Sequence, residues 1–338
     1  MSFRGIVIEQ TVIQGRIQEH NVQVRELPES FLDGSGGDSP IDIDVLYSGI
    51  NYKDGLAIAG KPGVARTSPL IPGIDLVGRV RESADERFTP GETVVLTGGG
   101  IGESSHGGLA TRARVRGDYL VTLPPGFDAR RAAAIGTAGF TAMVSIMALE
   151  REGVLPGHGP IVVTGAAGGV GSIAVAVLAK LGYSVSAVSG RAASESDYFH
   201  GLGASEILDR REFTEEGPAL QKRRWAGGVD TAGSTTLANI LAQTRDNGTV
   251  TTCGLAQGSD LPTTVMPFIL RGITLVGINS VTASRELRQH AWQRLARDLR
   301  FDLLDEMTTE IRLDEAPARA DAILRGQVRG RTVVSLMD

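Results

Sequence analysis

Apolar and polar residues alternate in short runs over roughly the first 125 residues of the chain. Residues 41–47 follow the period of two that is typical of a half-buried strand. Gly and Pro residues separate such runs, as at Pro72-Gly73 and Pro90-Gly91. Further strands are predicted at 6–12, 21–27, 74–81, 92–96 and 109–115. Many short strands with regular spacing indicate an all-β opening domain, built as a barrel or a sandwich.

The pattern then changes, and strands alternate with helices. A helical period runs over 130–150, and a β-branched strand at 161–164 leads through small residues into a helix that begins near Val170. Gly182 is placed to end that helix before an apolar strand at 183–188. Later helices are predicted at 195–202, 235–244, 284–304 and 316–325, and later strands at 206–208, 228–231, 248–253, 273–278, 311–313 and 332–336. The alternation predicts a doubly wound parallel sheet, with residues 130–299 as this α/β domain and residues 1–129 with 300–338 as the other.

The loop after the 161–164 strand has the spacing Ala166-x-Gly168-x-x-Gly171. This is a variant of the dinucleotide-binding fingerprint, whose glycines allow a tight turn, close approach of backbone N–H groups to a pyrophosphate and close packing of helix on strand. The helix N-terminus adds unpaired N–H groups and the positive end of the helix dipole. An ordinary βα turn can have this spacing, but the strand on each side and the helix favour nucleotide binding by Gly168, Gly169, Val170 and Gly171.

The end of the 183–188 strand is the position that distinguishes NAD from NADP. NAD-specific sites place a carboxylate there, about twenty residues after the glycines, to bind the ribose 2′-hydroxyl. This chain has Ser189, Gly190 and Arg191 instead, and its next acidic residue is Glu195. A guanidinium pairs well with a 2′-phosphate, so the sequence predicts NADPH, unless Arg191 is an ordinary surface residue. Because ligands lie beyond the carboxyl ends of parallel strands, residues after the later strands are also candidates: Gly254, Leu255, Ile278 and Ser280.

Composition limits the classes of function that remain. The formal charge of −5 argues against nucleic acid as a main partner. No apolar run approaches the length of a bilayer span and the N-terminus lacks the pattern of a signal peptide, so we expect no membrane partner. The lone Cys253 excludes an intrachain disulfide, fits a reducing cytoplasm and is expected to have a structural rather than a nucleophilic role.

The chain has an all-β domain, then a Rossmann domain, and then a short C-terminal segment that rejoins the first domain. This order resembles the medium-chain dehydrogenase/reductase superfamily over essentially the whole chain. Four blocks are similar to the acrylyl-CoA reductase branch of its quinone oxidoreductases: 51–57, 136–142, 164–172 and 262–270. The resemblance implies a GroES-like β-barrel catalytic domain in addition to the Rossmann domain. It also implies cofactor contacts by Arg210, Ile269 and Arg331, and a homodimer in which an edge strand at 273–278 pairs with its symmetry mate.

The metal ligands of the zinc enzymes in this superfamily are not matched. Asn51 and Ile74 stand where those enzymes carry Cys and His, and a structural zinc site needs a full set of Cys ligands where this chain has one Cys. The five His residues show no pairing at ligand spacing. We therefore expect no metal site, and reduction of an activated C=C bond needs no Lewis acid.

The activity that the resemblance implies is NADPH-dependent reduction of the C=C bond of a short α,β-unsaturated acyl-CoA, of the acrylyl-CoA to propionyl-CoA type. Hydride adds to the β-carbon, and the site needs a donor for the charge that builds on the thioester oxygen. The candidate catalytic residues follow an apolar strand: Tyr52 as enolate donor, cofactor ligand or packing surface, Asn51 as the other neutral donor, and Asp54 either to orient Lys53 or Tyr52 or to form a structural ion pair. Two other functions stay open here, a reductase of many quinones or small enones and a nucleotide-binding protein without catalysis.

Overall fold

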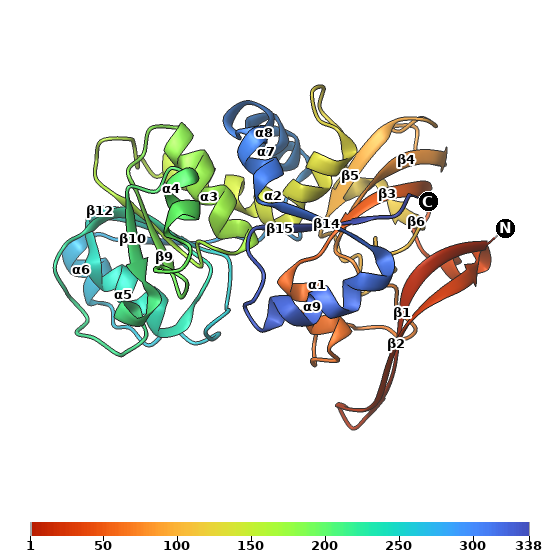
Figure 1. The fold of residues 1–338 in the computed structure, drawn as a ribbon, viewed down its shortest axis with the longest axis horizontal. Helices are drawn as coiled ribbons and strands as arrows, with labels where there is room; N and C mark the ends of the chain where they lie inside the picture. The colour runs from red at the N-terminus through yellow and green to blue at the C-terminus, as the bar shows by residue number, and fades with distance from the viewer. Residues whose placement is uncertain (1, 338) are drawn as a thin grey trace. The chain divides into compact units, whose positions relative to one another are not determined.

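The computed structural model describes residues 2–337, which cluster into two compact units whose elements are labelled in Figure 1. The first unit contains the described residues up to Thr137, Ser280–Trp292, and the described residues from Thr308 onward. The second unit contains Ala138–Asn279 and Gln293–Met307. The domain boundaries expected from the sequence rest on the order of elements rather than on contacts, and they stay a prediction.

A seven-stranded sheet organises the first unit. Its strands are β3 (Pro40–Gly49), β4 (Asp75–Ser83), β5 (Thr93–Thr97), β6 (Arg112–Arg116), β7 (Leu120–Thr122), β14 (Thr308–Arg312) and β15 (Arg331–Ser335). Their order is β14-β15-β3-β4-β5-β7, with β6 also paired to β3. β14 and β15 run parallel, and the other neighbouring strands run antiparallel. The alternating apolar residues of the strands, such as Ile41, Ile43 and Val45, fill its core, as their period of two predicts.

A hairpin and two packed helices also belong to the first unit. β1 (Ser2–Ile13) and β2 (Arg16–Pro28) form the long antiparallel hairpin drawn in red in Figure 1. α1 (Tyr52–Ile58) packs against α9 (Ala316–Leu324). A Cβ at Gly55 would lie 3.0 Å from the Ala320 carbonyl oxygen, so this glycine lets the two helices approach closely.

A six-stranded parallel sheet organises the second unit. Its strands are β8 (Ile161–Thr164), β9 (Val185–Ser189), β10 (Glu206–Asp209), β11 (Trp225–Asp230), β12 (Thr244–Thr252) and β13 (Thr274–Gly277). Their order is β10-β9-β8-β11-β12-β13, and every neighbouring pair is parallel. The helices that alternate with them are α3 (Gly169–Lys180), α4 (Ser196–Gly201), α5 (Ser234–Gln243) and α6 (Met266–Arg271). The strand order reverses at β8, which confirms the predicted doubly wound sheet and places β13 at an edge.

Several short elements differ from the sequence prediction. The single helix expected over 284–304 is two helices, α7 (Arg285–Asp298) and α8 (Phe301–Glu306), because Arg300 between them has extended backbone with φ −82° and ψ 116°. The sequence analysis did not predict α1, α6 or β7, which have seven, six and three residues. Each is too short to show a clear period along the sequence.

α2 (Ala129–Arg151) corrects a further expectation. It is the one helix in residues 2–337 with the length and apolar composition to cross a membrane, whereas the sequence analysis expected no such run. Its most apolar stretch is 89% buried within the fold, which is typical of a core helix. Gly136 interrupts α2 with φ 47° and ψ −155°, so two helical stretches meet at this residue.

Candidate functional site

The loop after β8 has the backbone geometry that the glycine spacing predicts. Gly165 adopts φ 60°, and a Cβ there would lie 2.2 Å from Oγ1 of Thr231. A Cβ at Gly171 would lie 2.3 Å from the Gly165 carbonyl oxygen, so only glycine lets α3 begin this close to the loop. Gly168 is the N-cap of α3. The loop therefore presents a helix N-terminus whose N–H groups can hold a pyrophosphate.

Two arginines follow the carboxyl ends of β9 and β10. Ser189 at the end of β9 pairs with Asp209 at the end of β10, so Arg191 and Arg210 both leave the sheet at this edge. A Cβ at Gly190 would lie 2.7 Å from Nε of Arg210, which means that the Arg210 side chain crosses this glycine. The Ser189 hydroxyl accepts a hydrogen bond from the Arg191 N–H at 3.1 Å. The edge thus gathers two guanidinium side chains and a hydroxyl where an NAD site would place a carboxylate.

Asp209 is the acidic residue that pairs with Ser189 at this edge, and its carboxylate is already bound by Arg211. Arg211 Nη2 lies 2.7 Å from Oδ2 of Asp209, and the Arg211 backbone N–H donates to Oδ1 at 2.8 Å. The side-chain hydrogen bond from Arg211 is the main reason that the pKa of Asp209 falls to about 2. Because Asp209 is already paired, this edge suits a phosphate better than a free ribose hydroxyl.

Asp230, at the end of β11, is a buried carboxylate beside the candidate site that the sequence analysis did not single out. It accepts hydrogen bonds from Oγ1 of Thr164 at 2.8 Å, from the Gly233 N–H at 2.9 Å and from Oγ1 of Thr252 at 3.2 Å. Thr164 ends β8 and Thr252 ends β12, so Asp230 ties together the carboxyl ends of three neighbouring strands. Burial raises the pKa of this carboxyl. An acidic residue at the end of an apolar strand was the available signal.

The Cys253 side chain is partly buried, and its thiol is hydrogen-bonded. Its Sγ atom donates to the Asp230 carbonyl oxygen at 3.4 Å. Burial, with a smaller effect of the Asp230 charge, raises the pKa of the thiol to about 12. A thiol with this pKa is not a thiolate at neutral pH, which favours the structural role expected from the sequence.

The remaining candidate cofactor residues lie in varied surroundings. Gly254 is in close backbone contact, since a Cβ there would lie 2.3 Å from the Thr231 carbonyl oxygen. Leu255 is exposed, and Ile269 on α6 is 71% exposed. The Ile278 N–H donates to the Thr252 carbonyl oxygen at 2.9 Å, whereas Ser280 belongs to the first unit. Their contacts with a cofactor stay predictions.

In the first unit, the candidate catalytic residues lie at the N-terminus of α1. Asp54 Oδ2 accepts the backbone N–H of Asn51 at 2.8 Å, and Asp54 Oδ1 accepts the Ile74 N–H at 2.9 Å. Both oxygens of Asp54 therefore hold the backbone around α1. These partners are backbone groups, so Asp54 acts on Tyr52 only through the backbone at the start of α1, and its role in orienting Tyr52 stays a prediction. Lys53 forms an ion pair with Glu103 instead, at 2.8 Å.

Asp75 joins several segments of the first unit, a role that the sequence analysis missed. It begins β4 and is 1% exposed. Its carboxylate accepts the Thr137 hydroxyl at 2.5 Å, the Thr137 N–H at 3.0 Å and Nδ2 of Asn51 at 2.8 Å. A Cβ at Gly136 would lie 2.3 Å from Oδ2 of Asp75. The glycine at the interruption of α2 therefore allows Thr137 to reach this carboxylate.

Arg331, the first residue of β15, is buried within the same group of side chains. Its Nε donates to the Ala134 carbonyl oxygen at 2.6 Å, and its Nη1 donates to Oδ1 of Asn51 at 3.1 Å. Nη2 lies 3.9 Å from Oδ2 of Asp75 and has no hydrogen-bond acceptor within the described residues. Burial raises the pKa of Asp75, which Arg331 opposes, and burial together with the Asp75 charge raises the pKa of Asp54 to about 7. A cofactor contact by Arg331 stays a prediction.

Tyr52 differs from these neighbours because its side chain is exposed. It is the first residue of α1 and is 43% exposed. Asn51, the other neutral donor of the group, uses its amide nitrogen on Asp75 and its amide oxygen on Arg331. Tyr52 is therefore the neutral donor of this group with a surface that a ligand can reach.

Metal ligands are not brought together in the described part of the chain. Ile74 is buried, and Asn51 is bound to Asp54, Asp75 and Arg331. Among residues 2–337, no group of three or more His, Cys, Asp or Glu side chains is arranged to hold a metal ion. The expectation that the protein has no catalytic metal stays a prediction.

Known families match both halves of the chain. Residues 37–125 match the alcohol dehydrogenase GroES-like domain, and residues 169–297 match the zinc-binding dehydrogenase family. The chain is 54% identical over 313 residues to the probable acrylyl-CoA reductase AcuI of Escherichia coli (strain K12), covering 93% of this chain and 95% of the relative. The chain belongs to the acrylyl-CoA reductase branch of the medium-chain dehydrogenase/reductases.

Solved structures extend this family match to the fold. The yhdH oxidoreductase from Salmonella enterica in complex with NADP has a TM-score of 0.93 at 50% identity, covering 99% of both chains. The putative quinone oxidoreductase YhfP of Bacillus subtilis (strain 168) is 40% identical over 99% of both chains, and its structure with NAD bound has a TM-score of 0.92. These matches confirm the predicted fold class of a GroES-like domain plus a Rossmann domain.

Proposed function

We propose that this protein is an NADPH-dependent oxidoreductase that reduces the C=C bond of a short α,β-unsaturated acyl-CoA, of the acrylyl-CoA to propionyl-CoA type. The observation that carries the proposal is the 54% identity to an acrylyl-CoA reductase over almost the whole of both chains. Two features of the structure support it. The carboxyl ends of β9 and β10 gather Arg191 and Arg210, and Tyr52 is an exposed neutral donor.

NADPH fits the residues at the carboxyl edge of the parallel sheet. Gly168, Gly169, Val170 and Gly171 present the N-terminus of α3 to the pyrophosphate. Arg191 and Arg210 pair with the 2′-phosphate, and the absence of a side chain at Gly190 leaves room for the Arg210 guanidinium. The further contacts that we propose are made by Tyr52, Ser189, Gly190, Gly254, Leu255, Ile269, Ile278, Ser280 and Arg331.

The chain's own residues supply positioning and one hydrogen-bond donor. NADPH, when bound, supplies the hydride that adds to the β-carbon of the unsaturated thioester. The C=C electron pair shifts toward the thioester oxygen, and a proton then adds to the α-carbon to complete the saturated product. Tyr52 donates to the thioester oxygen as its charge develops, a role worth about 3–4 kcal/mol for a preorganised donor in a water-excluded site. Asn51, Asp54 and Asp75 hold the start of α1 and so position Tyr52.

Comparison of two electron acceptors tests this function. NADPH consumption is measured with acrylyl-CoA and with a simple benzoquinone, under matched conditions. We expect kcat/KM for acrylyl-CoA to exceed that for the quinone by about a hundredfold or more, because the thioester would use binding energy from the CoA portion. A quinone that reacts as well as acrylyl-CoA would contradict the proposal. Failure of the protein to bind NADPH would contradict both reductase functions.

A broad NADPH-dependent reductase of quinones and enones is the alternative function. The observation that favours it is the 40% identity to the putative quinone oxidoreductase YhfP over 99% of both chains. A flat profile of kcat/KM over several quinones, small enones and acrylyl-CoA would support this alternative. A steep preference for acyl-CoA substrates would exclude it.

The edge of the parallel sheet supports a homodimer. β13 ends the strand order, so one side of it has no strand partner within the described residues. Large exposed apolar side chains lie in the segment before it: Leu255, Leu261, Val265, Met266, Ile269 and Leu270. An open edge strand next to such residues suits antiparallel pairing with a second copy. Light scattering at micromolar concentration should give the mass of a dimer, and a monomer mass would contradict the proposal.

The cellular setting that we propose is the cytoplasm. A single free Cys253 fits a reducing compartment, and NADPH and acyl-CoA substrates are cytoplasmic small molecules in this proposal. Nucleic acid and membranes are not proposed as partners, in line with the formal charge of −5. Fractionation of cells that express the protein would test its location, and recovery with the membrane pellet would contradict it.

A further inference from the structure

Arg288 on α7 is a fully buried cation that the proposed mechanism does not use. Its Nε donates to the Ala283 carbonyl oxygen at 3.1 Å. Its Nη1 donates to the carbonyl oxygen of Thr97 at 2.6 Å and to Oγ1 of Thr97 at 3.0 Å. Its Nη2 donates to the carbonyl oxygens of Ser280 at 3.0 Å and Val281 at 2.9 Å. One side chain therefore connects the end of β5 to the segment 280–283.

The segment 280–283 also makes close backbone contact with the turn that follows β5. The Gly99 N–H donates to the Val281 carbonyl oxygen at 3.0 Å. A Cβ at Gly98 would lie 3.0 Å from Cα of Val281. Gly98 and Gly99 have φ values of 70° and 65°, which glycine adopts without strain. The segment is thus held by the glycine turn on one side and by the Arg288 guanidinium on another.

Tyr119 covers the Arg288 guanidinium. The Arg288 Cζ atom lies 5.1 Å from the centre of the Tyr119 ring, within the range of a cation–π contact. The same ring lies against the glycine turn, since a Cβ at Gly99 would lie 2.6 Å from Cδ2 of Tyr119. Tyr119 is the last residue of η2 (Gly117–Tyr119), a short 3₁₀ turn.

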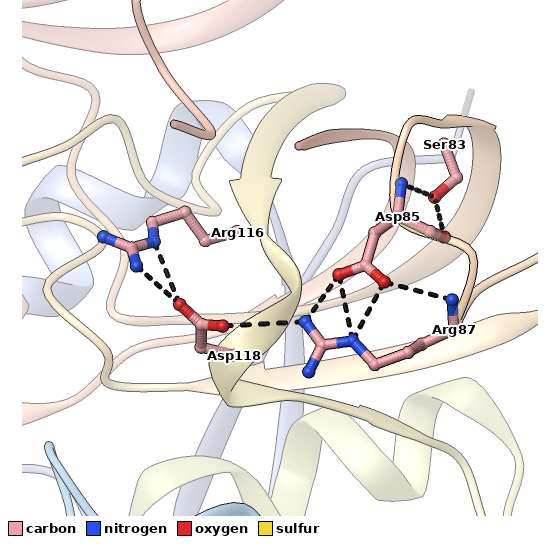
Figure 2. Close-up of polar contacts among 5 residues, drawn as sticks. All are labelled: Ser83, Asp85, Arg87, Arg116 and Asp118. Atoms are coloured by element: carbon pink, nitrogen blue, oxygen red, sulfur yellow. Dashed lines mark hydrogen bonds and ion pairs between the residues drawn. The ribbon is translucent and has the colours of Figure 1, made fainter. Parts of the chain in front are cut away.

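Figure 2 shows the polar contacts that Asp118 of η2 makes. Asp118 of η2 forms ion pairs with Arg116 at 2.6 Å and with Arg87 at 3.5 Å, and Arg87 is held in turn by Asp85. These pairs are partly exposed, so each adds little stability, but together they restrict the position of the turn. The support for Tyr119, and through it for Arg288, is built entirely from first-unit residues.

We infer that Arg288 is a positioning residue for Ser280, one of the NADPH contacts in the proposed function on which this inference rests. Arg288 binds the carbonyl oxygens of Ser280 and of its neighbour Val281, so it sets the backbone from which the Ser280 side chain projects. A lysine keeps the charge but has a single nitrogen, which cannot reach acceptors on two separate segments at once. Loss of the guanidinium removes the Arg288 donors from the carbonyl oxygens of Ser280 and Val281, so the segment is held less firmly although the Gly99 N–H still binds Val281.

Arg288→Lys tests the inference, with Arg294→Lys as the matched control. Arg294 lies on the same helix and is also largely buried, but its guanidinium binds Glu150 and Asp298. Both variants should lower the melting temperature. Arg288→Lys should also raise the Kd for NADPH, measured by cofactor fluorescence, by about tenfold or more, and should raise KM for NADPH far more than it changes kcat. Arg294→Lys should leave the Kd within about twofold of wild type.

A second variant tests the same contact with less disturbance. Thr97→Val keeps the side-chain shape and removes one acceptor of Arg288, so NADPH binding should weaken by about two- to fivefold. This variant decides the question if Arg288→Lys does not fold. An unchanged NADPH Kd in the folded Arg288→Lys protein, or in Thr97→Val where it alone folds, would overturn the inference. Failure of wild type to bind NADPH would instead overturn the proposed function.

Discussion

Replacing Gly171 with Ala should weaken both the second unit and its affinity for NADPH, whereas the same change at Gly201 should stabilise the protein. Both glycines are helical residues of the second unit, in α3 and α4. A Cβ at Gly171 would lie 2.3 Å from the carbonyl oxygen of Gly165 and 2.7 Å from Cα of Ala166. A Cβ at Gly201 meets nothing within 4 Å. The two positions therefore share a backbone preference and differ in the space available.

The size of each effect follows from these contacts. Ala is favoured over Gly in a helix interior by about 0.8–1 kcal/mol, so Gly201→Ala should gain about 0.5 kcal/mol at the end of α4. At Gly171 the same preference is offset by overpacking, which costs about 1–3 kcal/mol or more where the opposing atoms are backbone and cannot rotate away. We expect Gly171→Ala to lose about 1–2 kcal/mol of unfolding free energy. The displaced loop should also bind NADPH about tenfold or more weakly, since its N–H groups are the proposed pyrophosphate ligands.

Urea unfolding of wild type and both variants measures the stability changes, and a fluorescence titration measures NADPH affinity. Gly201→Ala controls for the general effect of adding a methyl group to a helix of this unit. If Gly171→Ala were as stable as Gly201→Ala and bound NADPH like wild type, the close packing of α3 on its loop would not be what requires glycine.

Four further predictions concern the cofactor, the catalytic donor, a buried acid and metal independence. Arg191→Ala should raise KM for NADPH by the equivalent of about 1–3 kcal/mol and leave KM for NADH nearly unchanged, and an unaltered cofactor ratio would reject the assignment. If Tyr52 is the enolate donor, Tyr52→Phe should lower kcat about a hundredfold and leave NADPH affinity intact. Weaker NADPH binding with a smaller loss of kcat would show that Tyr52 is a cofactor ligand, and wild-type behaviour would remove it from the mechanism. Burial raises the pKa of Asp54 to about 7, above the value of about 3.9 in the unfolded chain, so its contribution to stability is present below about pH 4 and is lost as the pH rises to about 7. Over this pH range, urea unfolding should show that the unfolding free energy of wild type falls relative to that of Asp54→Asn, by up to about 4 kcal/mol. A difference between the two proteins that does not change with pH would contradict the raised pKa. Turnover should survive a chelator, and stoichiometric zinc with chelator-sensitive activity would overturn the expectation of no catalytic metal.

Local sequence patterns were enough to predict the parallel sheet and the close packing of the glycine loop after β8. The spacing from Ala166 to Gly171 specifies contacts within one loop, and the structure shows the close approach that it implies. Arg191 and Arg210 were identified separately, one by position and one by resemblance, and the pairing of β9 with β10 brings them to one edge. These features depend on residues near each other in sequence or on a regular sheet register.

The buried network around Asp75 could not be predicted in the same way. Asp75 bonds to Thr137, 62 residues later, and lies near Arg331 at the other end of the chain. Nothing in the residues beside Asp75 specifies these partners, which only the fold brings together. α1 was missed for a different reason, because its start is marked by an Asn51 cap and Asp54 rather than by an apolar period. Arg288 lies in the helix predicted at 284–304, and nothing in the neighbouring residues indicates that tertiary packing buries its charge.

The single cysteine of the chain has a practical consequence for labelling. Cys253 is the one cysteine of the chain, and its pKa of about 12 leaves almost no thiolate to react with a maleimide near neutral pH. A cysteine introduced at an exposed site should therefore be modified alone, without first removing the native one. Ile13 at the end of β1 is 55% exposed and suits this purpose. A dye attached at Ile13→Cys would report on the hairpin while the sheet of the second unit keeps its native sequence.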